Sequence, residues 1–169
     1  MKRILFDTSV YGELVTELAI VQKLQNLKET EQIVFYGNKI IRNELRKTSV
    51  DKKIGNKKLR ILLLSLYDSL IKDKHSLEIT ELITVVAKKY FEEYQKIDGG
   101  YGQNAIMNDF LIVACASLHN LDILVSNDEK SMLGDKAIVA YKKVNKIFQL
   151  TNPYFVHYLG VWPRDLLRT

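Results

Sequence analysis

The hydrophobic positions of this chain alternate between short apolar runs and longer segments with a helical repeat. Residues 2–6 are apolar with large side chains and predict a buried strand that ends at Asp7. Residues 32–36 predict a second strand, and residues 122–125 predict a third that ends shortly before Asp128. Short apolar runs separated by helical segments are typical of an α/β fold with a parallel sheet.

The segments between these runs repeat their apolar positions every three or four residues, as amphipathic helices do. The repeat predicts helices over residues 9–26, 39–47, 57–71, 77–94, 104–118 and 144–150, with a short helix from about residue 128. Ser9 and Asn104 stand where the N-caps of the first and the central helix are expected. Residues 137–141 are apolar and predict a last strand.

The length of the chain, 169 residues, predicts a single domain with a substantial core. Residues 57–94 are expected to form a helical arm inserted between the second strand and the last α/β units. A glycine-rich joint follows at 98–102, and residues 151–169 form an aromatic tail without a clear period. The whole of 1–169 is therefore expected to be one α/β domain.

The composition favours a soluble globular protein, because 47% of the residues are hydrophobic and 27% are charged. Cys115 is the only cysteine, and neither a secretory segment nor an apolar run of membrane length is visible, so we expect a cytoplasmic protein without a membrane partner. Residues 38–74 hold eleven Lys and Arg against four Asp and Glu. This excess fits a surface that binds a polyanion, and it equally fits a solvated pair of helices.

Three acids are predicted to meet at one edge of the sheet. Asp7 and Asp128 each follow a strand and precede a helix, so each is also an ordinary candidate for a helix N-cap. Asp109 is followed by seven apolar or small residues, and burying its carboxylate there without a partner would cost several kcal/mol. Because parallel strands present their carboxyl ends on one edge, all three acids are expected there.

Glu44 lies near Arg42 and Arg46 and, taken alone, is an ordinary surface glutamate. Together with the other three acids it completes a set of four carboxylates, which would repel one another without a cation. Mg²⁺ and Mn²⁺ are hard cations that bind through a few carboxylates. Such a site in basic surroundings is equipped for the hydrolysis of phosphodiester bonds.

The segments LFDTSVYGEL, IIRNEL, NDFLIVACAS and ILVSND follow one another in the order and spacing of the PIN-domain nucleases. Within that superfamily the chain resembles the VapC-type toxin ribonucleases of prokaryotic toxin–antitoxin pairs. The resemblance covers roughly residues 2–140 and rests on these four short motifs. It implies a three-layer α/β/α sandwich with a central, mainly parallel sheet, and an acid cluster that binds Mg²⁺ or Mn²⁺ and cleaves RNA.

The resemblance also implies roles for individual residues. The catalytic acids and metal ligands fall on Asp7, Glu44, Asp109 and Asp128. The Ser or Thr two residues before the last acid falls on Ser126, whose hydroxyl can orient a carboxylate or a water, and Thr8 is expected to act in the same way. An RNA substrate, a homodimer and an antitoxin partner are implied as well.

Other interpretations stay open, because the arm at 57–94 and the tail past residue 150 are longer than this fold needs. One is a PIN-domain ribonuclease outside any toxin pair. Another is a catalytically silent module that holds RNA or a protein partner on residues 38–74, and a third is a nuclease that acts on DNA structures. No Cys/His spacing suggests zinc, and GGYG at 99–102 lacks the strand and the lysine of a phosphate-binding loop.

Overall fold

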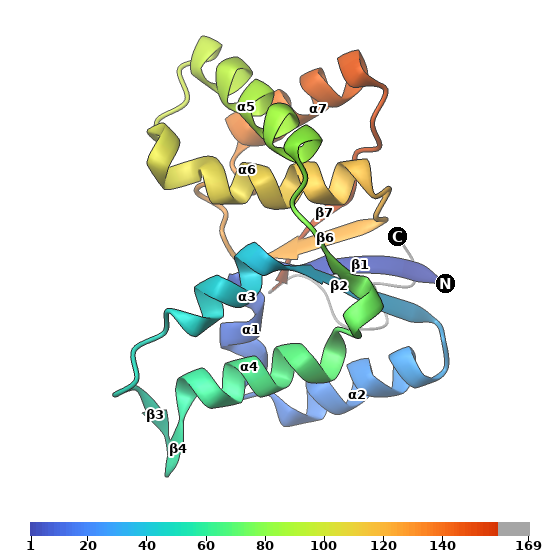
Figure 1. Cartoon of the computed structure of the whole chain (residues 1–169), viewed down its shortest axis with the longest axis vertical. Coiled ribbons are helices and arrows are strands. Elements are labelled where there is room, and N and C mark those ends of the chain that lie inside the picture. The colour runs from blue at the N-terminus through green and yellow to red at the C-terminus, as the bar shows by residue number, and fades with distance from the viewer. Residues whose placement is uncertain (159–169) are drawn as a thin grey trace.

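The computed structural model describes residues 1–158, in which strands and helices alternate along the chain (Figure 1). The first half contains β1 (Lys2–Phe6), α1 (Thr8–Leu14), α2 (Leu18–Glu29), β2 (Ile33–Asn38), α3 (Lys39–Arg46), β3 (Lys53–Ile54), β4 (Lys57–Lys58) and α4 (Leu59–Leu70). The second half contains the 3₁₀ helix η1 (Asp73–His75), β5 (Ser76–Leu77), α5 (Glu81–Lys96), α6 (Gln103–Leu118), β6 (Ile123–Ser126), α7 (Asp135–Phe148) and β7 (Tyr154–His157).

Five strands form one sheet in the order β5-β2-β1-β6-β7, and every neighbouring pair is parallel. Leu5 of β1 lies opposite Tyr36 of β2 and Leu124 of β6. Since all five strands run in the same direction, their carboxyl ends share one edge of the sheet. Asp7 and Ser126 reach that edge together, because they follow and end neighbouring strands.

Helices cover both faces of the sheet, which gives three layers (Figure 1). α6 lies next to the sheet on one face, and α5 packs along α6 and α7 on that side. α1, α2 and α4 cover the other face, while α3 stands beside the carboxyl ends of β1 and β2. The predicted α/β/α sandwich is therefore confirmed, and its sheet is parallel throughout.

The two helices expected within the arm at 57–94 are both present, but they lie on opposite faces of the sheet (Figure 1). α4 buries Leu63, Leu66 and Leu70 against the α1 side, and α5 buries its apolar face against α6 and α7. β5 joins the two and pairs with β2. The segment thus forms part of both helical layers.

The apolar stretch of α6 is explained by its position. Phe110 and every residue from Ile112 to Ala116 are fully buried, because the helix is enclosed by the sheet below and by α5 above. The Phe110 ring packs edge-on against Tyr94 and Tyr141, with ring centroids 5.5 Å apart in each pair. A helix that is buried on all sides carries no amphipathic pattern.

Several local predictions were wrong. The strand expected at 137–141 and the helix expected at 144–150 are one helix, α7, whose buried residues include Ala137, Ala140, Tyr141 and Val144. Those positions repeat at helical spacing, but the run of apolar residues imitates a strand. The helix expected from residue 128 is a series of turns over 129–133.

The N-terminal helix and two predicted caps also differ. The helix expected over 9–26 is interrupted between Leu14 and Leu18, so it forms α1 and α2. The N-cap positions are Asp7 for α1 and Gly102 for α6, so neither Ser9 nor Asn104 serves as the expected cap.

The aromatic tail contains β7, which extends the sheet beside β6. The rest of the expected tail, residues 159–169, lies outside the described residues. No helix within residues 1–158 is both long enough and apolar enough to cross a membrane.

Candidate functional site

Asp7 stands at the centre of the carboxyl edge, directly after β1, and its side chain is only 6% exposed. Its Oδ2 accepts a hydrogen bond from Ser126 Oγ at 2.9 Å and one from Ser9 Oγ at 2.8 Å. Although Asp7 occupies the N-cap position of α1, its carboxylate makes no capping hydrogen bond. Burial raises the pKa of Asp7; the two serine hydroxyls oppose this, and the charge of Glu44 adds to it.

Glu44 reaches the same edge from α3. Its Oε2 accepts a hydrogen bond from Thr8 Oγ1 at 2.5 Å, and its Oε1 accepts one from Asn108 Nδ2 at 2.7 Å. Thr8 adjoins Asp7 in the chain and Asn108 adjoins Asp109. The two hydrogen bonds therefore hold Glu44 between the strand-end acid and the acid of α6.

Asp109 and Asp128 share one serine. Ser131 Oγ lies 2.5 Å from Asp109 Oδ2 and 2.7 Å from Asp128 Oδ2. A hydroxyl has one hydrogen, so it donates to one carboxyl and accepts from the other only if that other group carries a proton. Burial, reinforced by the neighbouring acids, raises the pKa of Asp109 to about 7, although the hydrogen bond from Ser131 favours the ionised form.

The pKa of Asp128 is shifted in the opposite direction to that of Asp109. Its partial burial favours the neutral form, but hydrogen bonds from the Ser131 side chain and from the backbone N–H groups of Ser131 and Lys130 outweigh it, so its pKa is lowered. Asp128 thus caps the turn that follows β6, whereas the helix for which it was the expected N-cap is absent there, and it also contacts Ser131 beside Asp109. Near pH 7 this arrangement keeps Asp128 ionised and leaves Asp109 close to its titration midpoint.

All four predicted acids share one electrostatic environment, because the charges of Asp7, Asp128 and Glu44 each add to the effect of burial on the pKa of Asp109. They are nevertheless separated by hydroxyl and amide groups. Within residues 1–158, no three Asp, Glu, His or Cys side chains converge closely enough to form a ready-made metal site. The roles of these acids as metal ligands therefore stay a prediction.

The chemistry of the cluster fits a hard cation. Carboxylate and hydroxyl oxygens are the ligands that Mg²⁺ and Mn²⁺ take. The raised pKa values of Asp7 and Asp109 mean that burial and the neighbouring acids make the fully ionised cluster unfavourable, and a cation would remove much of that cost. To coordinate one ion together, the carboxylates would have to lie closer to one another than they do in this structure.

Three polar residues of the site were not predicted, namely Ser9, Asn108 and Ser131. Each lies within three residues of one of the acids, at Asp7, Asp109 and Asp128 respectively. That proximity is the only signal in the sequence, and it is shared by many surface polar residues. Their use depends on contacts such as that between Asn108 and Glu44, which are 64 positions apart.

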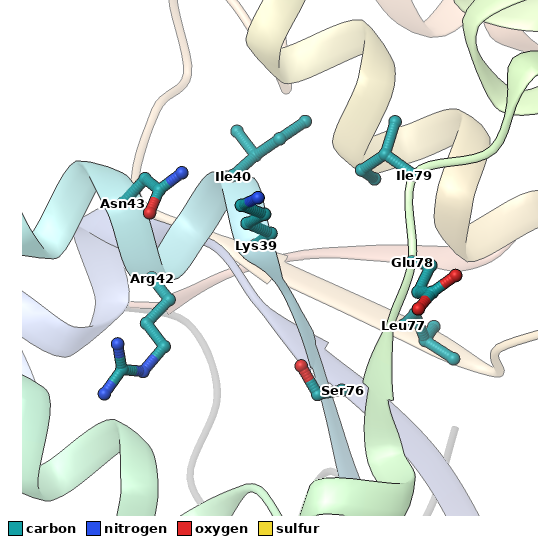
Figure 2. A pocket seen from close by; sticks show the side chains of 8 residues that line it. All are labelled: Lys39, Ile40, Arg42, Asn43, Ser76, Leu77, Glu78 and Ile79. Atoms are coloured by element: carbon teal, nitrogen blue, oxygen red, sulfur yellow. The ribbon is translucent and has the colours of Figure 1, made fainter.

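A hollow of about 600 Å³ lies between α3 and the β5 segment (Figure 2). Lys39 and Arg42 line it from α3, and Ile40 faces Ile79 across the gap. The Arg42 guanidinium is engaged by Asp68, with two N–O distances of 3.1 Å. Lys39 forms no salt bridge within residues 1–158, so its charge is available to a ligand.

Several solved structures share this fold over nearly the whole chain. VapBC2 from Rickettsia felis, bound to a DNA fragment from their promoter, matches with a TM-score of 0.60 and 16% identity, over 92% of this chain and 98% of that chain. FitAcB from Neisseria gonorrhoeae matches with a TM-score of 0.58 and 17% identity, over 94% and 99%. FitAB bound to an IR36 DNA fragment matches with a TM-score of 0.55 and 16% identity, over 91% and 94%.

No protein-family model and no curated protein sequence matches the chain. At 16–17% identity, the likeness to the solved structures establishes the fold alone. The PIN-like sandwich that the four sequence motifs implied is thus confirmed as the fold of this chain.

Proposed function

We propose that this protein is a metal-dependent endoribonuclease and the toxin of a VapBC-like toxin–antitoxin pair. The observation that carries the proposal is the group of four acids at the carboxyl edge of the sheet, where the pKa of Asp109 is raised to about 7. A pKa shifted by burial and by like charges is typical of functional sites. The fold shared with the VapBC2 and FitAB structures supports the proposal.

In this proposal Asp7, Glu44, Asp109 and Asp128 hold Mg²⁺ or Mn²⁺. When bound, such a cation supplies Lewis acidity toward a phosphate group and acidifies a water molecule. Ser126 and Ser9 fix the carboxylate of Asp7 by hydrogen bonds, and Thr8 does the same for Glu44.

Ser131 positions the two remaining acids against each other. Because the pKa of Asp109 is about 7, its carboxyl must lose a proton near neutral pH before all four groups can act as anionic ligands. Activity is therefore expected to rise with pH through this range.

The substrate would approach along the hollow beside α3 (Figure 2). Lys39 has no salt-bridge partner there within residues 1–158 and would contact a backbone phosphate, while Ile40 and Ile79 offer an apolar surface to a base. α3 carries both Lys39 and Glu44, so an RNA strand bound in the hollow would extend along this helix to the acids.

An antitoxin protein is proposed as the natural partner, and the protein is proposed to act as a cytoplasmic homodimer. The support for a partner is that the matching structures include VapBC2 and FitAB, each bound to DNA. A small open reading frame next to this gene, whose product copurifies with the chain and inhibits its cleavage of RNA, would support the pair. Cleavage without such a partner would favour a PIN-domain ribonuclease outside any toxin pair.

The test is a calorimetric titration with Mg²⁺ and with Mn²⁺, run beside a cleavage assay on structured RNA. Wild type is compared with Asp7→Asn and Asp109→Asn, and with Asp51→Asn, which removes an exposed carboxylate from the polar loop before β3. We expect both metal binding and cleavage to be lost in the two site variants and retained in Asp51→Asn. Full activity in Asp7→Asn and Asp109→Asn would reject the proposed site. Salt-dependent RNA binding without metal binding or turnover would instead indicate a silent RNA-binding module.

A further inference from the structure

A second hollow, of about 290 Å³, lies over the first half of β2, on the side of the sheet's amino-terminal edge and away from the acids. Lys28 at the end of α2 lines it, together with Lys72, Lys74 and His75 from the segment between α4 and β5. Its floor includes the first residues of β2. In Figure 1 this region lies near the N-terminus, whereas α1 and α3 mark the end that carries the acids.

The positive charge of this hollow is not neutralised by ion pairs. None of the three lysines forms a salt bridge within residues 1–158, and Glu31 is the only acid among the residues that line the hollow. Lys28 is half-buried, and its Nζ donates to the backbone carbonyl of Ser69 at 2.5 Å. This hydrogen bond holds one ammonium group at the wall of the hollow.

The basic side chains of the hollow also repel one another. Burial lowers the pKa of Lys28, and the charge of Lys72 lowers it further, although nearby Glu29 opposes this. Burial likewise lowers the pKa of His75, and Lys74, Lys72 and Lys28 add to the effect. An anion that binds among these groups would relieve this repulsion, which is why such clusters favour anionic ligands.

The hollow is too far from the acids to belong to the same binding site. The hollow lies over Ile33, Val34 and Phe35, and at about 3.3 Å per residue these positions are about 10–17 Å from Asn38 at the carboxyl end of β2. A ligand that engages both regions must be long and must carry negative charges along its length. A single-stranded RNA has this form, with one phosphate for each nucleotide.

We propose that the hollow formed by Lys28, Lys72, Lys74 and His75 is a second RNA-binding site that holds backbone phosphates away from the bond that is cleaved. Lys72 and Lys74 are exposed and can contact phosphates as point charges, while Lys28 forms the fixed wall. The proposal rests on the proposed ribonuclease function, because RNA is the polyanion that this function supplies. In this proposal the second site retains long RNA and takes no part in the chemical step.

The test compares RNA binding by wild type and by Lys72→Gln/Lys74→Gln as a function of salt concentration. The probe is a mixed-sequence single-stranded RNA of about 20 nucleotides, longer than the 4–16 nucleotides that one single-strand site typically covers. Divalent cations are left out so that the RNA stays intact. Lys142→Gln/Lys146→Gln is the matched control, because it removes the same charge from exposed positions of α7 on the other face of the sheet.

We expect the slope of log K against log salt to fall by about 0.7 for each lysine removed, or about 1.4 in total. This corresponds to roughly 25-fold weaker binding at 0.1 M salt, relative to a reference at 1 M where this contribution vanishes. The control should keep the wild-type slope. Equal slopes in the two double variants, or an unchanged slope in Lys72→Gln/Lys74→Gln, would overturn the proposal and leave the hollow to a different partner, such as an acidic protein.

Cleavage assays separate this proposal from the ribonuclease assignment. A dinucleotide, with a single phosphate between its two nucleosides, is too short to reach from the acids to the hollow, so Lys72→Gln/Lys74→Gln should cleave it at the wild-type rate while its KM for the long RNA rises. A variant whose KM for the long RNA stays at the wild-type value would contradict the second site alone. A wild-type protein that cleaves neither RNA would contradict the ribonuclease assignment, and the salt slopes would still decide whether the hollow binds RNA.

Discussion

Replacing Asp109 by Asn should stabilise the protein when no metal is present. The carboxyl of Asp109 is largely buried in the structure, and burial together with the charges of Asp7, Asp128 and Glu44 raises its pKa from 3.8 to about 7. Asn has nearly the same shape, and its Oδ1 can accept the hydrogen bond from Ser131. It cannot ionise, so it does not experience the repulsion that acts on the aspartate at high pH.

The direction of this change in stability follows from the proton affinities of Asp109 in the folded and the unfolded protein. Below pH 3.8 both the folded and the unfolded protein carry a protonated Asp109, so the raised pKa costs no stability there. Between pH 3.8 and about 7 the unfolded state ionises and the folded state does not, so stability falls as pH rises through this window. At about 1.4 kcal/mol for each pH unit the loss is about 4 kcal/mol, and solvent screening of the partly exposed carboxyl reduces it to roughly 2–3 kcal/mol.

The assay is urea unfolding of wild type and Asp109→Asn at pH 4.5 and pH 8, with EDTA present. At pH 8 we expect the variant to have the higher free energy of unfolding, by roughly 2–3 kcal/mol, and a Tm higher by about 5–10 °C. The difference should shrink at pH 4.5. Adding Mg²⁺ should then stabilise wild type more than the variant, because the cation binds only the folded acid cluster.

Asp51→Asn serves as the control, because it removes a carboxylate from an exposed loop and should change the stability little at either pH. The reasoning would be refuted if Asp109→Asn were no more stable than wild type at pH 8, or if its advantage were the same at both pH values. Either result would mean that burial and the neighbouring acids do not raise the pKa of Asp109 in the folded protein.

Two further substitutions test other contacts of the structure. Ser131→Ala removes the hydroxyl that favours the ionised forms of Asp109 and Asp128, so the pKa of both acids should rise. The acid limb of the pH–rate profile for RNA cleavage should then move to higher pH, and an unmoved limb would contradict the role of Ser131. Asn145→Ala removes a fully buried amide that contacts Tyr90, Ser117 and Asn152, so urea unfolding should show a free energy of unfolding lower by about 2–4 kcal/mol. The control Lys146→Ala changes an exposed residue of the same helix and should lower the free energy of unfolding by less than about 0.5 kcal/mol.

The sequence predicted the strands and helices whose pattern is set by their own burial. β1, β2 and β6 are short apolar runs, and α3, α4 and α5 bury one face each, so their patterns report directly on their packing. The errors fall where a pattern is ambiguous or the decisive contact is distant. The run at 137–141 fits either a strand or a buried helix, and only packing of α7 against α5 decides between them.

β7 and the break between α1 and α2 depend on partners far along the chain. Tyr154–His157 becomes a strand because the edge of β6 accepts it, a contact that no local period reveals. Glu17 lies in the interruption of the first predicted helix, and its carboxylate accepts a hydrogen bond from the Tyr158 hydroxyl at 2.8 Å. Apolar residues at 10, 14 and 18 continue the helical repeat across the break, although Leu18 is 71% exposed.

The candidate site shows the same division. The strand-end positions of Asp7 and Asp128 and the apolar setting of Asp109 could be read from the sequence, because a parallel sheet fixes where its carboxyl ends lie. The place of Glu44 followed only from the motif IIRNEL and the resemblance that it carries, since α3 meets the site through hydrogen bonds with Thr8 and Asn108 from two other helices. Geometry also supplied the hydroxyl and amide groups of Ser131 and Asn108 that lie between the carboxylates.

For the ribonuclease function proposed here, the separation of charge along the sheet matters more than the net charge of +5 does. Four acids at the carboxyl edge would repel a polyanion if they stood alone, and a metal ion would offset only part of that repulsion. The lysines of the second hollow, which lies over the first half of β2 about 10–17 Å from its carboxyl end, can attract the same RNA strand without sharing the acids' site. Because attraction between exposed charges weakens beyond about 8 Å at physiological salt, each end acts on a different stretch of the RNA. The two proposals together therefore predict that a long RNA is retained at the second hollow while another of its phosphates meets the acids, and that a short RNA relies on the acids alone.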